Sequence, residues 1–245
     1  MKWYTMNKDN IIPYPPTHMM FDGPQTLHEF VGNGLEYLHH YSALADLQPN
    51  ERMLDVGSGI GRKTIPLTRF LTEGSYEGID CNRTGVQWCQ ENITPVAPNF
   101  RFQHVDVHAP GYNPNGALQA YDIRFPFPDN EFDFVTLNSV FTHMLDRSID
   151  NYLREVYRVL VPGGRCFITW FLVDEGVTAP PGFPHRHLNG WMANKEFPEQ
   201  AIAYDSDWVM VAYADAGLGN GMGYQGTWNG RPGTAYQDII IAKKE

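Results

Sequence analysis

A short apolar segment followed by three evenly spaced glycines most constrains how this chain folds. Residues 52–56 are predicted to form a buried strand, and Gly57, Gly59 and Gly61 follow it before a predicted helix at 62–71. Glycine can adopt a positive φ and lets the backbone approach a ligand, while free amides at a helix start attract an anionic group. The pattern predicts the ligand loop of an α/β protein, and a tight strand-to-helix turn is the alternative.

The glycine spacing argues against two common phosphate-binding loops. A dinucleotide fingerprint needs a third glycine at position 62, where this chain has Arg62. A P-loop needs Gly-Lys followed by Ser or Thr, and Lys63-Thr64 lacks the required preceding spacing. Both interpretations are therefore weakened.

Composition limits the size, location and partners of the protein. The 245 residues fit one α/β domain with a sizeable core, and a formal charge of −10 argues against nucleic acid as a partner. The three cysteines are odd in number and lack metal-ligand spacing, so we expect reduced thiols and no metal site. No apolar run reaches membrane-spanning length and no signal-peptide pattern opens the sequence, which predicts a cytoplasmic protein that does not enter membranes.

Strand and helix patterns alternate along most of the chain. Predicted strands cover 52–56, 75–80, 100–107, 133–137, 164–172 and 237–242, and predicted helices cover 27–47, 62–71, 84–92, 148–160 and 206–216. This alternation predicts a mostly parallel, doubly wound sheet. Residues 173–200 show no clear period and are expected to form an insertion near the site, and the aromatic, proline-rich first 25 residues are expected to lie on the domain as packing or as a lid.

Two acidic residues end predicted strands, where ligands bind in sheets of this kind. Asp80 closes the second strand and can accept hydrogen bonds from both hydroxyls of a ribose, or it can cap the next helix. Asp106 closes the third strand, where it is either a ligand-binding residue or an Asp in an ordinary turn.

Asp55, Gly57, Gly59 and Gly61 match Asp-x-Gly-x-Gly-x-Gly, and the chain resembles the class I S-adenosylmethionine-dependent methyltransferases at this motif. Residues 125–144 and 153–164 are similar to the broad branch that includes the ubiquinone and menaquinone biosynthesis methyltransferases, so the resemblance covers about residues 50–172. It implies a Rossmann-like, seven-stranded, mostly parallel sheet with an antiparallel last strand and helices on both faces. Residues 226–231 and 236–238 also look like a bacterial small-molecule branch.

The resemblance implies one methyltransferase domain over residues 1–245. Its parts would be an N-terminal lid and helix (1–48), a cofactor-binding core (50–172), a substrate-side insertion (173–200) and a C-terminal helix with strands (201–245).

The resemblance also implies which residues contact S-adenosyl-L-methionine, the methyl donor. The glycine loop would face the methionyl part, Asp80 the ribose, Asp106 the adenine, and Asn138 with Ser139 the sulfonium region. The full predicted set is Asp55, Gly57, Ser58, Gly59, Gly61, Asp80, Cys81, Asp106, Val107, Asn138 and Ser139.

The residues that would handle the methyl acceptor are less specific. His143 follows the fourth strand and is the candidate general base, although a structural histidine at a helix start is the alternative. Arg231 is a candidate for binding an acidic substrate group, or a solvated charge in a turn. The aromatic candidates for an acceptor pocket are Tyr14, Phe21, Trp170 and Trp228.

These observations predict a methyltransferase that moves a methyl group to an oxygen or nitrogen of a small-molecule metabolite by in-line displacement. Oxygen is favoured because His143 is available. The alternatives are methylation of a protein or carbohydrate chain, and a noncatalytic cofactor-binding subunit. The expected partners are a small-molecule acceptor and, in a homodimer, a second copy of the chain.

Overall fold

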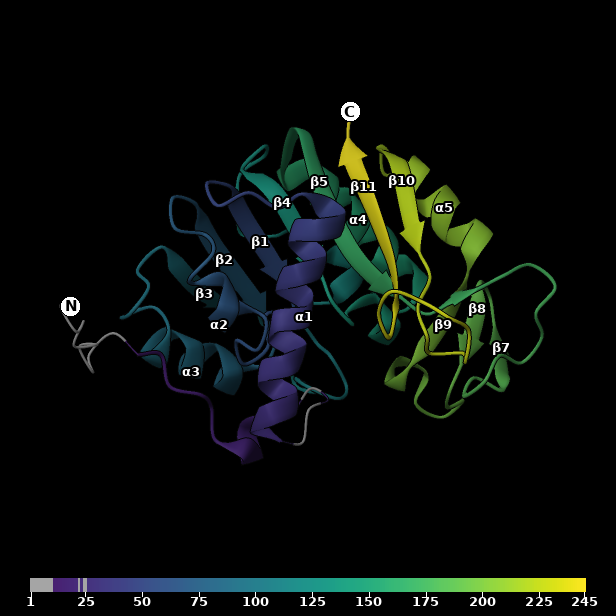
Figure 1. Cartoon of the computed structure of the whole chain (residues 1–245). Coiled ribbons are helices and arrows are strands. Elements are labelled where there is room, and N and C mark those ends of the chain that lie inside the picture. The colour runs from purple at the N-terminus through teal and green to yellow at the C-terminus, as the bar shows by residue number, and fades with distance from the viewer. Residues whose placement is uncertain (1–10, 22, 24–25) are drawn as a thin grey trace. The chain divides into compact units, whose positions relative to one another are not determined.

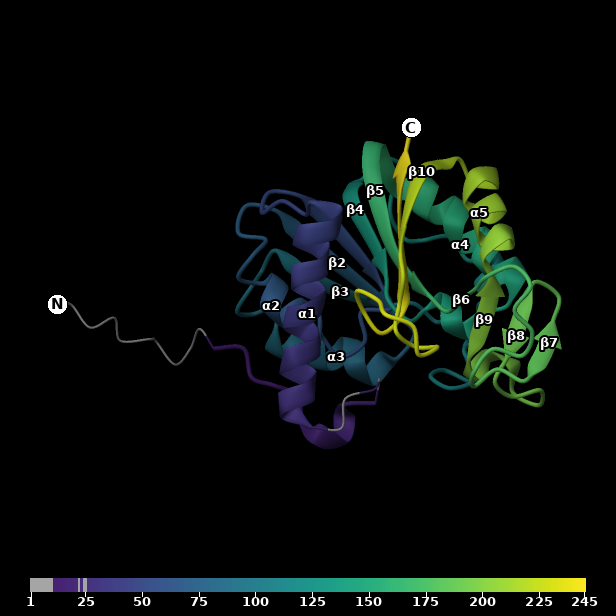
Figure 2. The ribbon, with the colours of Figure 1, turned by 45° about the vertical axis from the view of Figure 1, so that its right-hand side comes forward.

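The computed structural model describes residues 11–21, 23 and 26–245, and its contacts group the chain into two compact units. Unit 1 comprises Met1–Glu51 and Ser58–Val105, and unit 2 comprises Arg52–Gly57 and Asp106–Glu245. The first ten residues of the predicted lid lie outside the described residues. Figure 1 labels most helices and strands of both units, and β6 is labelled in Figure 2.

The strands of the large sheet follow the order β10-β11-β5-β4-β1-β2-β3, which confirms the predicted seven-stranded fold class. In unit 2, β1 pairs with β4 and β4 with β5 in parallel, and β11 runs antiparallel to both β5 and β10. In unit 1, β2 and β3 form a parallel pair. The strands are β1 (Arg52–Val56), β2 (Ser75–Asp80), β3 (Phe100–His104), β4 (Phe132–Leu137), β5 (Leu160–Trp170), β10 (Leu218–Tyr224) and β11 (Asp238–Lys244).

The helices of unit 1 are α1 (Leu27–Ala45), α2 (Thr64–Leu67) and α3 (Arg83–Asn92). The prediction of a helix over 62–71 was wrong in extent, because α2 contains only four residues between turns. Pro66 has no N–H, so it cannot donate to the carbonyl of Arg62, and the helix ladder is interrupted. Gly34 of α1 packs against this region: a Cβ on Gly34 would lie 2.4 Å from the Arg62 carbonyl oxygen.

The helices of unit 2 are α4 (Asp146–Val159) and α5 (Ser206–Asp215), each beginning or ending within two residues of the predicted bounds. The buried residues of α4 recur at three- and four-residue spacing, which gives the helix one apolar face. That face contacts β5, α4 also contacts α5, and α5 contacts β10. Figures 1 and 2 show α5 beside β10 in unit 2.

The predicted bounds of β5 and β3 were wrong by several residues, and β10 was not among the predicted strands. β5 starts at Leu160 rather than at 164, because the Pro-Gly-Gly segment forms an irregularity inside the strand: Phe132 pairs with Leu160 but Phe134 pairs with Arg165. β3 stops at His104, so Asp106 lies beyond the strand, in a loop where Val107 bridges to Leu118.

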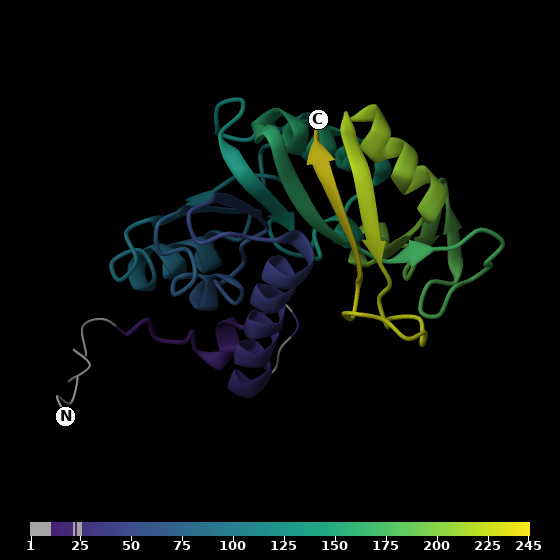
Figure 3. The same ribbon diagram turned by 45° about the horizontal axis from the view of Figure 1, so that its top comes forward.

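Residues 173–200, for which no regular structure was predicted, contribute to a second sheet in unit 2 with the order β6-β9-β8-β7. Its strands are β6 (Leu172–Val173), β7 (His185–His187), β8 (Gly190–Met192) and β9 (Ile202–Asp205). Only Phe171 separates β5 from β6, and the Ser206 hydroxyl donates to the Val173 carbonyl at 3.1 Å. Figure 3 shows the small sheet's β7 and β8 region beyond β10 and α5.

Short 3₁₀ helices connect several elements. They are η2 (Thr17–Met19), η3 (Ala120–Asp122), η4 (Phe141–His143) and η5 (Pro198–Gln200). In the described part of the chain, no helix combines the length and apolar character needed to cross a bilayer.

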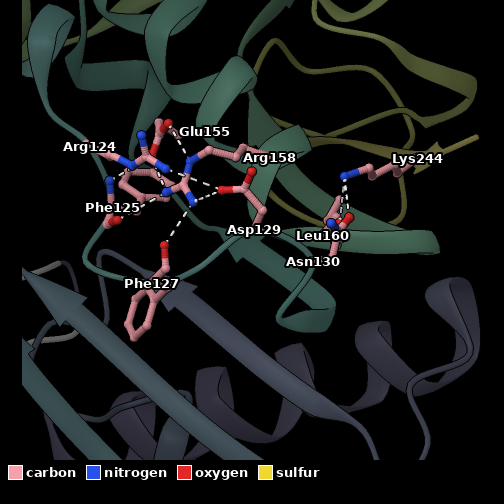
Figure 4. Close-up of polar contacts among 9 residues, drawn as sticks. All are labelled: Arg124, Phe125, Phe127, Asp129, Asn130, Glu155, Arg158, Leu160 and Lys244. Carbon is pink, nitrogen blue, oxygen red and sulfur yellow. Dashed lines mark hydrogen bonds and ion pairs between the residues drawn. The ribbon is translucent and has the colours of Figure 1, made fainter.

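Arg158 of α4 fixes the segment that leads into β4 (Figure 4). Its guanidinium donates to the Phe125 and Phe127 carbonyls at 3.0 and 2.8 Å, and it forms ion pairs with Glu155 and Asp129. The hydrogen bond from Arg158 lowers the pKa of Asp129. The proline-rich stretch before β4 is therefore held by side-chain bonds where it has no strand partner.

Candidate functional site

The glycine loop of unit 1 is tied to the end of β2. The Gly59 amide donates to Asp80 Oδ2 at 2.7 Å, and the Ser58 amide donates to the Ile79 carbonyl at 3.2 Å. Gly61 has φ +79°, and a Cβ there would lie 2.6 Å from Ile93 Cδ1. Only glycine fits this position without displacing its neighbours.

Asp80 braces the loop rather than capping the next helix. Its Oδ1 accepts from the Asn82 amide at 2.6 Å, while the α3 cap is made by Asn82, whose Oδ1 accepts from the Gly85 amide at 2.9 Å. A carboxylate offers about four acceptor positions, so one amide on each oxygen is compatible with further donors. The predicted ribose role stays a prediction.

Cys81 follows Asp80 with a thiol that stays protonated. Burial, together with the neighbouring charge of Asp80, raises the pKa of Cys81 to about 12. The Cys81 carbonyl lies 3.1 Å from His104 Nε2. A neutral thiol at this position can contact a ligand but cannot serve as a nucleophile at neutral pH.

Unit 2 contains the first part of the motif, at the end of β1. Asp55 is fully buried in the strand. Gly57 has φ +84°, and a Cβ there would lie 2.5 Å from Val140 Cγ2, a residue just beyond β4. The close approach of Val140 explains why glycine occupies this position.

Asp106 organises the loop after β3. Its Oδ1 accepts from Asn113 Nδ2 at 3.0 Å, and its carbonyl accepts from the Leu118 amide at 2.9 Å. Val107 is buried beside it. These bonds are those of an aspartate in a turn, and an adenine contact stays a prediction.

Asn138 and Ser139 lie at the end of β4. Asn138 Nδ2 donates to Thr136 Oγ1 at 2.8 Å. Ser139 has φ +57°, its amide donates to Thr169 Oγ1 at 2.8 Å, and its hydroxyl donates to Gln237 Oε1 at 2.8 Å. Sequence reasoning did not select Gln237 as a site residue; the only signal was the family-like segment 236–238.

His143 ends η4 and is partly buried. Burial lowers the pKa of His143, against the opposing effect of the Glu199 and Gln200 backbones. His143 Nδ1 lies 3.1 Å from the Glu199 carbonyl oxygen, so the N–H is assigned to Nδ1 and Nε2 keeps its lone pair. The Tyr112 ring meets the imidazole edge-on at 6.0 Å. This tautomer suits a general base, and the same bond would also orient a structural histidine.

The predicted aromatic candidates differ in exposure. Trp170 is fully buried, with Nε1 donating to the Tyr213 hydroxyl at 3.1 Å and its ring packed on Phe141. Tyr14 and Phe21 are exposed in unit 1, and Tyr14 meets the Phe30 ring edge-on. In this structure Trp170 is part of a packed core, whereas Tyr14 and Phe21 keep accessible surface.

Trp228 and Arg231 are held by the buried carboxylate of Asp238. Trp228 Nε1 donates to Asp238 Oδ2 and Arg231 Nη2 to Asp238 Oδ1, each at 2.6 Å. Arg231 Nη1 also donates to Asp174 Oδ2 at 2.8 Å. The Arg231 charge is therefore paired with two carboxylates, and an acidic substrate group would have to compete with them.

The structure thus brings together some predicted residues within each unit. In unit 1 the loop amide of Gly59 meets Asp80, and in unit 2 Trp228 meets Arg231 at Asp238. Ser139 meets a residue that was not predicted, Gln237. Among residues 11–21, 23 and 26–245, no cluster of three or more His, Cys, Asp or Glu side chains is arranged to bind a metal ion.

Comparison with known proteins identifies a family that part of the chain resembles. Residues 54–168 match the family model described as "Methyltransferase domain". The fatty-acid O-methyltransferase of Mycolicibacterium smegmatis is 32% identical over 130 residues, covering 53% of this chain and 40% of that protein. The ubiquinone/menaquinone biosynthesis C-methyltransferase of Vibrio cholerae is 28% identical over 127 residues, covering 51% of this chain and 42% of that protein. The matched region spans about two-fifths of the length of these relatives.

Solved structures share the fold. A SAM-dependent methyltransferase from Aquifex aeolicus gives a TM-score of 0.56 at 20% identity, covering 95% of this chain and 100% of that chain. PigF with SAH gives a TM-score of 0.58 at 14% identity, covering 88% of this chain and 57% of that chain.

The sheet order is that of the α/β fold shared by the solved methyltransferase structures. Residues 54–168 match a methyltransferase domain, and the class I S-adenosylmethionine-dependent methyltransferases are the family that this part of the chain resembles.

Proposed function

We propose that this chain transfers a methyl group from S-adenosylmethionine to an oxygen of a small-molecule metabolite, with a nitrogen as the second choice. The observation that carries the proposal is the bond between the Gly59 amide and the Asp80 carboxylate, which fixes the glycine loop on the end of β2 within a matched methyltransferase domain. We further propose a cytoplasmic location, in keeping with three free cysteines among the described residues.

The residues present fit the methyl donor. Gly57 and Gly61 lack the side chain that would collide with Val140 and Ile93, so the backbone of the loop can turn close to a ligand. The Gly57–Gly59 segment would hold the methionyl part, Asp80 the ribose and Asp106 the adenine. When bound, S-adenosylmethionine supplies an electrophilic methyl group on a sulfonium.

His143 would take the proton from a hydroxyl acceptor. The neutral form is favoured because burial lowers its pKa, and the Glu199 carbonyl holds the N–H on Nδ1. The lone pair of Nε2 is then available to accept the proton. Alignment of the acceptor oxygen with the methyl group would supply much of the remaining acceleration, up to about 7–11 kcal/mol in well-oriented intramolecular reactions.

The relatives support a small acceptor. One similar protein is a fatty-acid O-methyltransferase and another is a ubiquinone/menaquinone biosynthesis C-methyltransferase, and both names refer to small molecules. A protein or carbohydrate acceptor and a noncatalytic cofactor-binding subunit are the alternatives. The noncatalytic alternative would show donor binding without methyl transfer to any acceptor.

Calorimetry with S-adenosylmethionine tests the proposal. The Asp80→Ala variant should bind S-adenosylmethionine at least tenfold more weakly, a loss of about 1.4 kcal/mol. The substitution removes the carboxylate that holds the glycine loop and that would accept hydrogen bonds from the ribose. The control is Asp207→Ala on an exposed residue of α5, which should leave the affinity unchanged. A wild-type protein that does not bind the donor, or equal affinities in both variants, would contradict the proposed donor site.

Methyl transfer itself is measured with radiolabelled donor and a panel of fatty acids, phenols and amines. We expect label in the acid or phenol fraction. Donor binding with no transfer across the panel would favour the noncatalytic alternative.

A further inference from the structure

Gln237 lies where three strands of unit 2 meet at one edge of the sheet. It immediately precedes β11, whose Asp238 pairs with Trp170 at the end of β5. Its side chain meets Ser139, just beyond β4, and Thr169, near the end of β5. Gln237 is only 7% exposed. A buried carboxamide thus sits at the carboxyl ends of β4 and β5, where ligands bind in open α/β sheets.

The hydrogen bonds fix which way the carboxamide points. Thr169 Oγ1 accepts from the Ser139 amide at 2.8 Å, which leaves its own hydrogen to donate to Gln237 Oε1 at 2.7 Å. The Ser139 hydroxyl donates to the same Oε1 at 2.8 Å. Two donors therefore occupy the oxygen, and the amide nitrogen carries its two hydrogens on the other side.

The Nε2 donor of Gln237 has no hydrogen-bond partner among residues 11–21, 23 and 26–245. Gln237 Nε2 is not fully buried, so water can satisfy this donor until a ligand oxygen takes its place. Here the protein satisfies only the oxygen. The nitrogen is left to a molecule that enters the site.

The backbone at Ser139 provides an independent observation. Its φ of +57° is left-handed, a conformation that residues other than glycine adopt at a cost. The strained turn is what brings both the amide and the hydroxyl of Ser139 into the network with Thr169 and Gln237. Strained residues of this kind gather at functional sites.

The place of Gln237 in the sheet favours the acceptor over the methyl donor. In the strand order of unit 2, β11 is separated from β1 by β5 and β4. β1 leads into the glycine loop, which is assigned to the donor. In the strand order, Gln237 and the β1 end of the glycine loop therefore lie on opposite sides of β4.

We propose that Gln237 is a substrate-binding residue whose Nε2 donates a hydrogen bond to an oxygen of the methyl acceptor. This inference rests on the proposed methyltransferase function. It names a substrate class, molecules that carry a carboxylate, carbonyl or hydroxyl oxygen beside the methylated atom. A site built to donate to an oxygen discriminates strongly against analogues that lack it.

Binding to the protein saturated with S-adenosylhomocysteine tests the proposal without turnover. The probes are dodecanoic acid, 4-hydroxybenzoate and catechol, each measured by calorimetry. Gln237→Met keeps the length of the side chain and removes the donor, and it should weaken the best-bound probe at least tenfold, about 1.4 kcal/mol. The control is Gln225→Met, the same change at an exposed glutamine after β10, which should leave probe affinity unchanged.

A second variant guards against misfolding. Gln237→Glu retains oxygens that accept from the Ser139 and Thr169 hydroxyls, but it presents a negative charge in place of the N–H donor. At pH 8 this variant should therefore also lower the affinity for the probe. Circular dichroism and unchanged donor affinity show that both variants are folded. The proposal is overturned if both bind every probe as wild type does, if they lose donor affinity instead, or if wild type binds the donor but none of the probes. Failure of the proposed function gives a different result, absence of donor binding by wild type.

Discussion

Replacing Asp238 by Asn tests how the segment around Trp228 and Arg231 is held. The buried Asp238 carboxylate accepts four hydrogen bonds: from Arg231 Nη2 and Trp228 Nε1 at 2.6 Å, and from the Gly226 and Leu172 amides at 2.8 Å. Asparagine has nearly the same shape but only one acceptor oxygen. The substitution therefore changes hydrogen bonding and charge while leaving the packing almost unaltered.

The expected loss of stability follows from the donors left without an acceptor. If the amide oxygen faces Arg231 and Gly226, the new NH₂ group meets two other donors, from Trp228 and Leu172. Each buried donor left unsatisfied costs about 1–3 kcal/mol, and breaking a buried ion pair costs about 3–5 kcal/mol. These terms overlap because they share one network. We expect Asp238→Asn to lower the free energy of unfolding by about 3–5 kcal/mol.

Asp174→Asn is the matched control, because Asp174 binds the same guanidinium. Its side chain is 62% exposed, so this ion pair should contribute at most about 1 kcal/mol. Urea denaturation followed by circular dichroism measures both variants, with the midpoints compared at unchanged slope. Equal losses in the two variants would refute the reasoning that burial and the four donors make Asp238 the dominant partner.

Three further predictions follow from backbone packing and from the partly buried His143. Gly34→Ala should destabilise the protein by about 1–3 kcal/mol, because its Cβ would clash with the Arg62 carbonyl. Gly32→Ala has no atom near its Cβ and should stabilise α1 by about 0.5–1 kcal/mol. Equal shifts of the two variants in thermal denaturation would contradict this contrast. Burial lowers the pKa of His143 below its ordinary 6.5, so the free energy of unfolding should be highest above that pH and fall as pH decreases through the lowered value. The acid limb of kcat should likewise lie below pH 6.5, and His143→Gln should lower kcat by about 10²–10⁴-fold with unchanged donor affinity; an unaltered pH–rate profile in this variant would remove His143 from the reaction.

Sequence patterns located the regular elements where local signals were strong. The predicted bounds of β1 and β2 are those observed, because turn-forming residues such as Gly57, Gly74 and Asn82 flank these two short strands. The extent of α2 was mispredicted because the single Pro66 outweighed the apolar spacing around it. The strands of the small sheet have two to four residues, too few to show a period, and they depend on distant pairings such as Leu172 with Tyr204.

The candidate site shows the same division between local and distant information. The glycine loop and Asp80 could be selected because their spacing is visible in the sequence. The partners of Gln237 lie 98 positions away at Ser139 and 68 positions away at Thr169, so no local pattern joins them. Likewise, the turn role of Asp106 depends on Asn113 and Leu118, which meet it only when the loop closes.

The contact between Val173 and Ser206 gives residues 174–205 the properties of an exchangeable cassette. The chain departs after β6 and returns at the start of α5, where the Ser206 hydroxyl bonds to the Val173 carbonyl. Insertions whose two ends already meet impose little extra closure entropy on the host fold, so their length can change at small cost. A change in the length of residues 174–205 would therefore cost the host fold little closure entropy, but a replacement that removes the Glu199 carbonyl would release the Nδ1 bond that orients His143.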